Sequence, residues 1–176
     1  LEIARTGSAP SADSWIQAAY LAGDVLLIAV LAIALLARDR DAAAFVEAAI
    51  LAAAGASVVW ITIAHRYFDL SDPTYLSSAG VAVVLGYVLI DVVGSALALR
   101  LLAAGRVGVP LGLLAASALA LAASDMAWNW LTVASTYVPG SWADLGWLLA
   151  SLLGGVAALH PRMASAFEPA DAGSHD

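Results

Sequence analysis

The sequence contains no cysteine and no lysine, and it is poor in charged residues. The absence of cysteine excludes structural disulfides, thiolate-ligated metals and covalently attached haem within this chain. All 7 basic residues are arginine, so no lysine amine can form a Schiff base with retinal or pyridoxal phosphate. A net charge of −7 argues against nucleic acid as a partner. Motifs for zinc, a phosphate loop or a nucleophile are also absent, and we therefore expect a chain without enzyme activity, cofactor or metal.

Hydrophobic residues dominate what is present. They make up 62% of the 176 residues, whereas about 45–50% is usual in soluble domains. The longest apolar runs exceed the length of about 20 residues that a helix needs to cross a hydrocarbon core of about 30 Å. No segment alternates with the period of two that a membrane β-barrel would require. The sequence therefore predicts an all-α integral membrane protein whose surroundings are a lipid bilayer.

Five membrane spans are expected, at about 14–37, 42–64, 78–102, 109–135 and 143–159. They form one transmembrane domain, 14–163, between a polar lead at 1–13 and an acidic, flexible tail at 164–176. The first run is too long for the core of a signal peptide, so we predict that it is retained as a span. The fifth run is at the short limit for a span.

The arginines predict an amino terminus outside the cell and a carboxyl terminus inside it. With that orientation the inner segments hold most of the arginines, as the positive-inside rule requires. The inner arginines are Arg38, Arg40, Arg100, Arg106 and Arg162, and the outer ones are Arg5 and Arg66. Glu47 lies close to the inner face beside Arg38 and Arg40, and we expect an interfacial ion pair there.

Three aspartates lie inside the apolar runs: Asp24, Asp91 and Asp125. A carboxylate in the middle of a bilayer is energetically expensive, and by default it marks a functional site whose partner has to be found. At a rise of about 1.5 Å per residue, all three lie roughly 14–20 Å below the outer surface. Three carboxylates at one depth on three helices would repel one another or share protons. We predict that they meet inside the bundle.

Aromatic and amide side chains accompany these aspartates. Tyr20 and Tyr87 each precede an aspartate by four residues, and Asn129 follows one by four, so each shares a helix face with its carboxylate. Acids beside aromatic faces suit a small amphipathic or cationic ligand, and we predict a pocket for one that is open to the outside. The predicted lining is Tyr20, Asp24, Tyr87, Asp91, Asp125 and Asn129, with Trp60, Trp128, Trp130 and Trp147 as walls.

Other interpretations of the aspartates remain open. Each carboxyl could be protonated and bind a serine, a tyrosine or a backbone carbonyl on a neighbouring helix, which would hold the bundle together. Ion translocation is a further possibility. His65 and His160 are expected at opposite membrane faces, so they cannot ligate one haem iron. Small residues at a spacing of four, such as Ala150, Gly154 and Ala158, permit close helix approach.

The fifth span and the residues after it resemble a known signature. Asp144–Ala150 reads D-L-G-W-L-L-A, and Gly154–Met163 reads G-G-V-A-A-L-H-P-R-M. These segments resemble the "D-x-G-W-L-L … G-A-A-L-H-P-S-M" signature in the amino-terminal membrane region of bacterial, especially actinobacterial, GGDEF and EAL signalling proteins. Tyr87-x-x-x-Asp91 looks like that region's "Y-P-x-x-D" helix, and Ala123-Ser124-Asp125 looks like its "A-A-D" helix.

The resemblance implies a multi-helix sensory module in the bacterial cytoplasmic membrane that relays a signal to cyclic di-GMP synthesis or hydrolysis. Val88 replaces the proline of that signature, and neither a GGDEF nor an EAL motif occurs in the sequence. We therefore expect a non-enzymatic signal-transduction module, either as a fragment of a longer signalling protein or as a stand-alone relative whose output is a separate protein. The alternatives are an accessory or structural subunit of a larger membrane complex and, third, a small transporter.

Overall fold

The computed structural model describes residues 12–38, 42–65, 78–105, 107–134 and 136–167, and these residues are almost entirely helical. The elements are α2 (Ala12–Arg38), α3 (Ala42–Val59), the π-helix η1 (Trp60–Ala64), α5 (Ser78–Ala103), α6 (Val109–Val133), α7 (Trp142–Ala158) and the 3-10 helix η2 (Ala164–Phe167). No strand occurs in this part of the chain, which confirms the all-α prediction. The predicted lead and the tail beyond Phe167 lie outside the described residues, except that Ala12 and Asp13 begin α2.

Four of the helices are long and apolar enough to cross a membrane, in segments 19–37, 43–62, 86–103 and 109–132. The apolar helix α7 is shorter, at 17 residues. Pro110 stands in the first turn of α6. Backbone N–H groups in a first turn have no helical acceptor, so the N–H that proline lacks costs no helical hydrogen bond there. The chain therefore has the helices of a multi-pass membrane protein.

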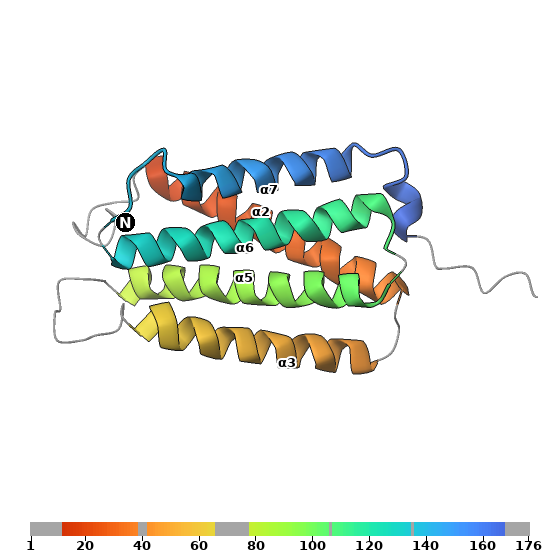
Figure 1. Cartoon of the computed structure of the whole chain (residues 1–176), viewed down its shortest axis with the longest axis horizontal. Coiled ribbons are helices and arrows are strands. Elements are labelled where there is room, and N and C mark those ends of the chain that lie inside the picture. The colour runs from red at the N-terminus through yellow and green to blue at the C-terminus, as the bar shows by residue number, and fades with distance from the viewer. Residues whose placement is uncertain (1–11, 39–41, 66–77, 106, 135, 168–176) are drawn as a thin grey trace, which may run out of the picture.

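Figure 1 shows α3, α5, α6 and α7 side by side in one layer, with α2 crossing behind them. In that layer α5 packs between α3 and α6, and α7 packs on α6, while α2 contacts both α5 and α6. Successive helices run in opposite directions, so the bundle has two ends. We call the end where α2 begins the near end and the end where α2 finishes the far end.

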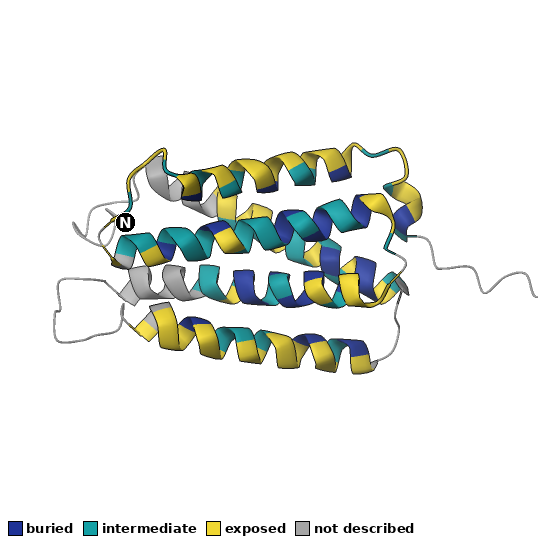
Figure 2. Ribbon diagram, viewed as in Figure 1, coloured by how far each residue is buried: buried dark blue, intermediate teal, exposed yellow. Residues whose placement is uncertain are grey.

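The buried core of the described residues lies towards the far end. Its largest fully buried side chains are Leu31 and Leu35 of α2, Leu101 of α5 and Leu111 of α6. Burial is greatest along α5 and α6, as Figure 2 shows, whereas α3 and α7 expose apolar side chains along much of their length. Exposed leucine, isoleucine and valine on helices of this length suit contact with lipid, because lipid chains are as apolar as these side chains.

The contact between α6 and α7 is the closest helix approach in the described bundle. A Cβ added at Gly146 would lie 2.8 Å from both Cβ and Oγ of Ser124, and one added at Gly154 would lie 3.1 Å from Oγ of Ser117. The hydroxyl of Ser124 donates to the carbonyl of Ala143, and that of Ser117 donates to the carbonyl of Ala150 at 2.7 Å. We call Ser117, Ser124, Gly146 and Gly154 the serine–glycine seam. The four residues place the two helix backbones in close contact, as small residues do in membranes.

An ion pair joins α3 to α5 near the far end. Nε of Arg100 lies 2.8 Å from Oε2 of Glu47. The predicted ion pair of Glu47 is therefore present, but its described partner comes from the neighbouring helix instead of the turn that follows α2. The reason is the packing of α3 against α5, which brings the last turn of α5 beside the start of α3. The side chain of Arg38 and the whole of Arg40 lie outside the described residues.

Ordered structure continues beyond the predicted bundle, into the first residues of the predicted tail. Ala164–Phe167 forms η2, which contacts α2. Ala166 is buried, and Phe167 packs against the apolar core at the far end. In the sequence this turn is indicated by Phe167, a large aromatic residue among small and acidic ones.

We predict that Gly146→Ala destabilises the bundle and that Gly155→Ala does not. The new methyl group in Gly146→Ala meets Ser124, and overpacking of this kind costs about 1–3 kcal/mol. Gly155 lies on the same helix with open space around it, so its substitution isolates the intrinsic effect of Gly to Ala, which favours the helix. Unfolding in mixed micelles by titration with sodium dodecyl sulfate, followed by circular dichroism, measures both variants. Equal stability of the two would contradict the seam.

Candidate functional site

The three aspartates inside the apolar runs meet in the bundle. Asp24 comes from α2, Asp91 from α5 and Asp125 from α6, each from the interior of its helix. The carboxyls of Asp91 and Asp125 are hydrogen-bonded to each other, and Asp24 interacts electrostatically with both. Asp91 is only 7% exposed. We call these three side chains the carboxyl layer, and their meeting agrees with the depth argument from the sequence.

A hydrogen bond between two carboxyl groups requires a proton on one of them, because ionised carboxylates only accept hydrogen bonds. Asp91 and Asp125 therefore hold one proton between them in this geometry. The charged groups that act on the layer, among the described residues, are acidic, and no arginine contributes. In many buried sites a basic side chain neutralises the acidic one, but here a shared proton neutralises one of the two carboxyl groups.

A tryptophan from a fourth helix completes the layer. Nε1 of Trp147, on α7, donates to Oδ1 of Asp125 at 2.6 Å. A short bond of this kind from an N–H to an acid oxygen is stronger than a bond between two neutral groups. The carboxyl of Asp125 therefore binds α5 through Asp91 and α7 through Trp147. We predicted Trp147 as an apolar wall, but the structure uses its indole N–H as a donor.

Little empty space remains beside the layer. Asp24 and Asp91 line a cavity of about 10 Å³ together with apolar side chains of α2, α5 and α6. Such a volume accommodates about one water molecule. The space beside Asp24 and Asp91 is therefore too small for an organic ligand, and the pocket open to the outside stays a prediction. On one side of this space Gly94 of α5 faces α2, where an added Cβ would make ordinary van der Waals contact, 3.6 Å from Cγ1 of Ile28.

Of the remaining predicted residues, the tyrosines and the asparagine lie near the carboxyl layer, and the other tryptophans do not line its cavity. Tyr87 interacts electrostatically with all three aspartates and with Tyr20, which is 65% exposed, so both phenols lie near the layer. Asn129 is buried, and its Nδ2 donates to the backbone carbonyl of Asp125 at 2.8 Å. The tryptophans predicted as further walls do not line the cavity beside the layer. Trp60 and Trp130 are each 49% exposed.

A polar cap at the near end fixes the start of α7. Asp144 accepts from the hydroxyl of Tyr137 at 2.9 Å and from the N–H of Gly140 at 2.5 Å. Gly140 has φ +84°, a left-handed conformation that other residues adopt only with strain. Partial burial and the Asp144 carboxylate raise the pKa of Tyr137, so its phenol stays protonated as a donor. The ring of Trp128 packs edge-on against Tyr137, with ring centres 6.1 Å apart.

Sequence reasoning missed the residues that dock α7. Asp144 was noted only as part of a resemblance, and Ser117, Ser124 and Gly146 were not chosen as contact residues. The available signal was the spacing: Ser117 and Ser124 lie seven residues apart on α6, and their acceptors Ala143 and Ala150 lie seven apart on α7. A common seven-residue repeat on two helices is the pattern of a packed seam.

No group of three or more histidine, aspartate or glutamate side chains that could hold a metal ion occurs among the described residues. Comparisons with protein-family models, with curated proteins and with solved structures give no match for this chain.

We predict that Asp91→Asn removes one protonated carboxyl group and leaves the fold intact. The asparagine amide can donate to Asp125 in place of the shared proton, so the contact between α5 and α6 persists. Infrared spectroscopy of the purified chain in lipid measures the carbonyl band of protonated carboxyl groups, which should lose intensity in this variant. Asp144→Asn is the control, since Asp144 lies outside the layer. A band of unchanged intensity in Asp91→Asn would contradict proton sharing.

Proposed function

We propose that this chain is a transmembrane sensory module and that the carboxyl layer is its input site. One observation carries the proposal: acidic side chains from three helices and an indole from a fourth are in contact inside an apolar bundle. Burial of acidic groups without a basic partner among the described residues opposes folding. Ionisable residues within membrane segments are rare and mark functional sites by default.

The layer has the properties of a two-state switch. With the shared proton in place, Asp91 and Asp125 hold α5 against α6. Loss of that proton leaves two like charges in contact, which repel by about 4 kcal/mol at about 4 Å and an effective dielectric constant of about 20. Moving a two-state equilibrium from about 1:99 to 99:1 requires about 5.5 kcal/mol. One proton therefore supplies most of the free energy that such a switch needs.

The small size of the cavity limits which molecules or ions can act as the signal. A volume of about 10 Å³ excludes a preformed site for an amphipathic molecule, so protons, or a small cation that enters as α2 and α5 separate, are the inputs that we favour. Such an input acts by changing the relative stability of two helix arrangements. A larger ligand would first have to part the helices that line this cavity.

The proposal includes an orientation of the chain in the membrane and an enzyme that receives its signal. The arginine distribution supports an amino terminus outside and a carboxyl terminus inside the membrane. The resemblance of Asp144–Met163 to the membrane region of GGDEF and EAL proteins supports the bacterial cytoplasmic membrane as the location. It also supports a cyclic di-GMP enzyme, in another domain or another protein, as the receiver of the signal.

Distance measurements between spin labels test the switch, since the cysteine-free sequence permits labels at chosen positions. Cysteines introduced at Ala104 and Ala158, both exposed at the far end, report on the ends of α5 and α7. We expect the distance to increase from mildly acidic to mildly alkaline pH, because deprotonation makes Asp91 and Asp125 repel. Double electron–electron resonance in liposomes measures it.

Two variants test whether the carboxyl layer causes the pH-dependent change in distance. Asp91→Asn should abolish the pH-dependent shift while the protein still inserts into liposomes, and Asp144→Asn should keep the shift. The proposal fails when the wild-type distance does not respond to pH. It also fails when Asp91→Asn responds as the wild type does, because the switch then lies elsewhere.

An accessory or structural subunit is the second candidate, and the packing of α3 favours it. Among the described helices α3 packs mainly on α5, and η1 contacts α6, so much of the apolar surface of α3 is exposed. Native mass measurement after gentle extraction separates the candidates: a stable hetero-complex supports the subunit, whereas a lone chain or a homodimer supports the sensor. Flux measurements in proteoliposomes test the third candidate, a small transporter.

A further inference from the structure

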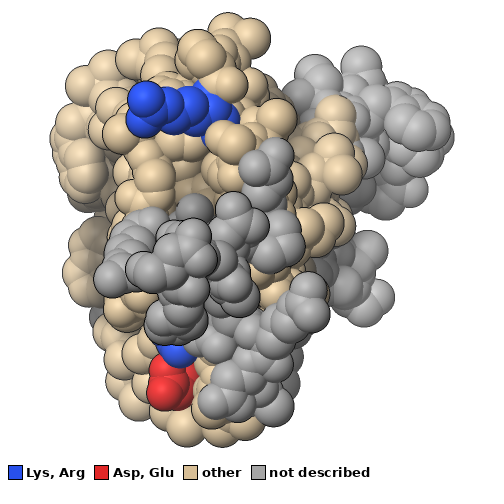
Figure 3. All heavy atoms as spheres, turned by 90° about the vertical axis from the view of Figure 1, so that its right-hand side faces the viewer, with Lys and Arg blue, Asp and Glu red and all other residues tan. Residues whose placement is uncertain are grey.

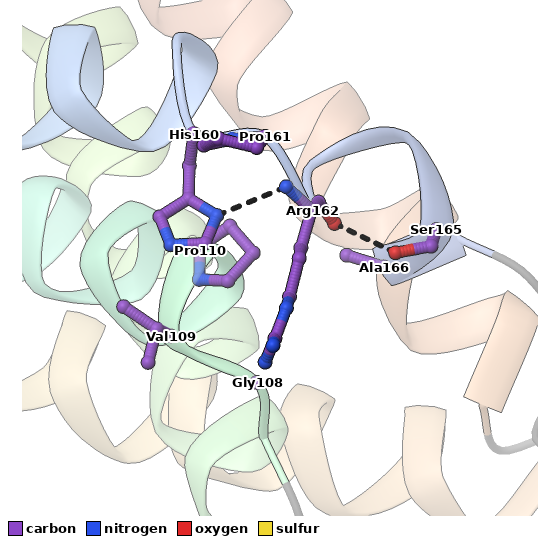
Figure 4. Close-up of a pocket in the computed structure, with 8 residues that line it drawn as sticks. All are labelled: Gly108, Val109, Pro110, His160, Pro161, Arg162, Ser165 and Ala166. Carbon is purple, nitrogen blue, oxygen red and sulfur yellow. Dashed lines mark hydrogen bonds between the residues drawn. The ribbon is translucent and has the colours of Figure 1, made fainter.

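The far end of the bundle contains a second, larger cavity. Its volume is about 480 Å³, and it lies between the start of α6, the segment that follows α7, and η2. Figure 4 shows the ring of His160 and the side chain of Arg162 running side by side towards the first residues of α6. This volume is within the range of about 300–1,000 Å³ that is typical of small-molecule sites. We call it the far-end cleft.

Arg162 gives the cleft a positive charge. No described carboxylate lies within ion-pair distance of its guanidinium, in contrast to Arg100, which pairs with Glu47 at the same end. Figure 3 shows the far-end surface. Low in the view arginine atoms touch acidic atoms, whereas near the top an arginine side chain lies apart from the described acidic atoms. A guanidinium presents several N–H donors in a planar fork that matches the geometry of a phosphate.

Two further groups of donors face the same cleft. The backbone N–H of Arg162 donates to Nδ1 of His160 at 3.1 Å, so the ring carries its proton on Nε2, where it can donate. Gly108, the N-cap of α6, lines the cleft without a side-chain cap. The first turn of a helix leaves backbone N–H groups without helical acceptors and carries partial positive charge, and in α6 these donors exclude Pro110, which has no N–H. The cleft thus combines a guanidinium, an imidazole donor and a helix start.

The rim of the cleft is apolar on the side that continues into the spans. Val109, which lines the cleft, is 64% exposed, and Leu159, next to His160, is 86% exposed. Below them α7 exposes apolar side chains along the bundle, among them Leu148, Leu152 and Val156. A ligand that joins a phosphate to hydrocarbon chains would match both parts, whereas a free phosphate would use only the donors.

We propose that the far-end cleft binds the phosphate headgroup of an anionic lipid, with the acyl chains lying along the apolar rim. Arg162 supplies the charge, and the His160 ring and the start of α6 supply neutral donors. This inference is independent of the carboxyl layer, which lies in the middle of the bundle. In the orientation proposed above, the cleft opens at the cytoplasmic leaflet, where anionic lipids attract basic side chains.

Lipid titration of the full chain tests this site. Native mass spectrometry counts phosphatidylglycerol and phosphatidylcholine molecules bound to the chain released from mixed micelles. We expect a preference for phosphatidylglycerol, which Arg162→Gln weakens by about fivefold, the effect of one basic side chain at an anionic surface. Arg162→Lys should retain part of it, because it keeps the charge but not the planar fork. Arg66→Gln, an equal change of charge at a position that is not part of the cleft lining, should retain all of it.

A soluble arm distinguishes the two sources of phosphate. Inorganic phosphate and glycerol 3-phosphate are titrated onto the same proteins in a neutral detergent. Binding that depends on Arg162 only in the lipid arm supports the proposal. Binding that depends on Arg162 only in the soluble arm overturns the lipid assignment, and equal lipid preference in Arg162→Gln and Arg66→Gln overturns the site. Circular dichroism of Arg162→Gln establishes that this exposed substitution leaves the helices intact.

Discussion

The close contact of α6 and α7 is the constraint on which the rest of the structure depends. Ser124 and Gly146 leave no room for a side chain between the two backbones, and the serine hydroxyls bind carbonyls across the gap. Gly146 lies two residues after the cap residue Asp144, and Trp147 follows it directly. The seam therefore sets the position of the indole against Asp125 and of the near-end turn against α7. It also places the end of α7 beside the start of α6, where the far-end cleft forms.

The carboxyl layer occupies the interior of this framework and has a different energetic basis. Most of the bundle is held by packing of alanine, leucine and small residues, which in a membrane brings little gain from burial alone. The layer is held by hydrogen bonds between α5, α6 and α7, with the carboxyl of Asp24 on α2 beside them, and the bond between Asp91 and Asp125 depends on a single proton. Packing makes the site rigid and nearly dry, which strengthens each electrostatic interaction inside it. A change in protonation is therefore felt by α2, α5, α6 and α7 together.

Composition and periodicity were enough to predict the helices, because long apolar runs bounded by polar turns have few other solutions in lipid. Depth along each helix was enough to bring Asp24, Asp91 and Asp125 to one level. The packing of α2 against α5 beside them was not predictable, since it depends on which helix faces meet. The ion pair of Glu47 with Arg100 was not predictable for the same reason, since it depends on the packing of α3 against α5. The donor role of Trp147 likewise required the rotation of α7.

The shortness of α7 bears on the bilayer itself. A helix of 17 residues is about 26 Å long, which is less than the hydrocarbon thickness of about 30 Å, whereas the 27 residues of α2 extend about 40 Å. Lipids that border α7 have to thin or tilt to cover it, and those around α2 do not. The protein thus has one side adapted to a thinner membrane. We expect this asymmetry to influence the membrane thickness that the protein prefers.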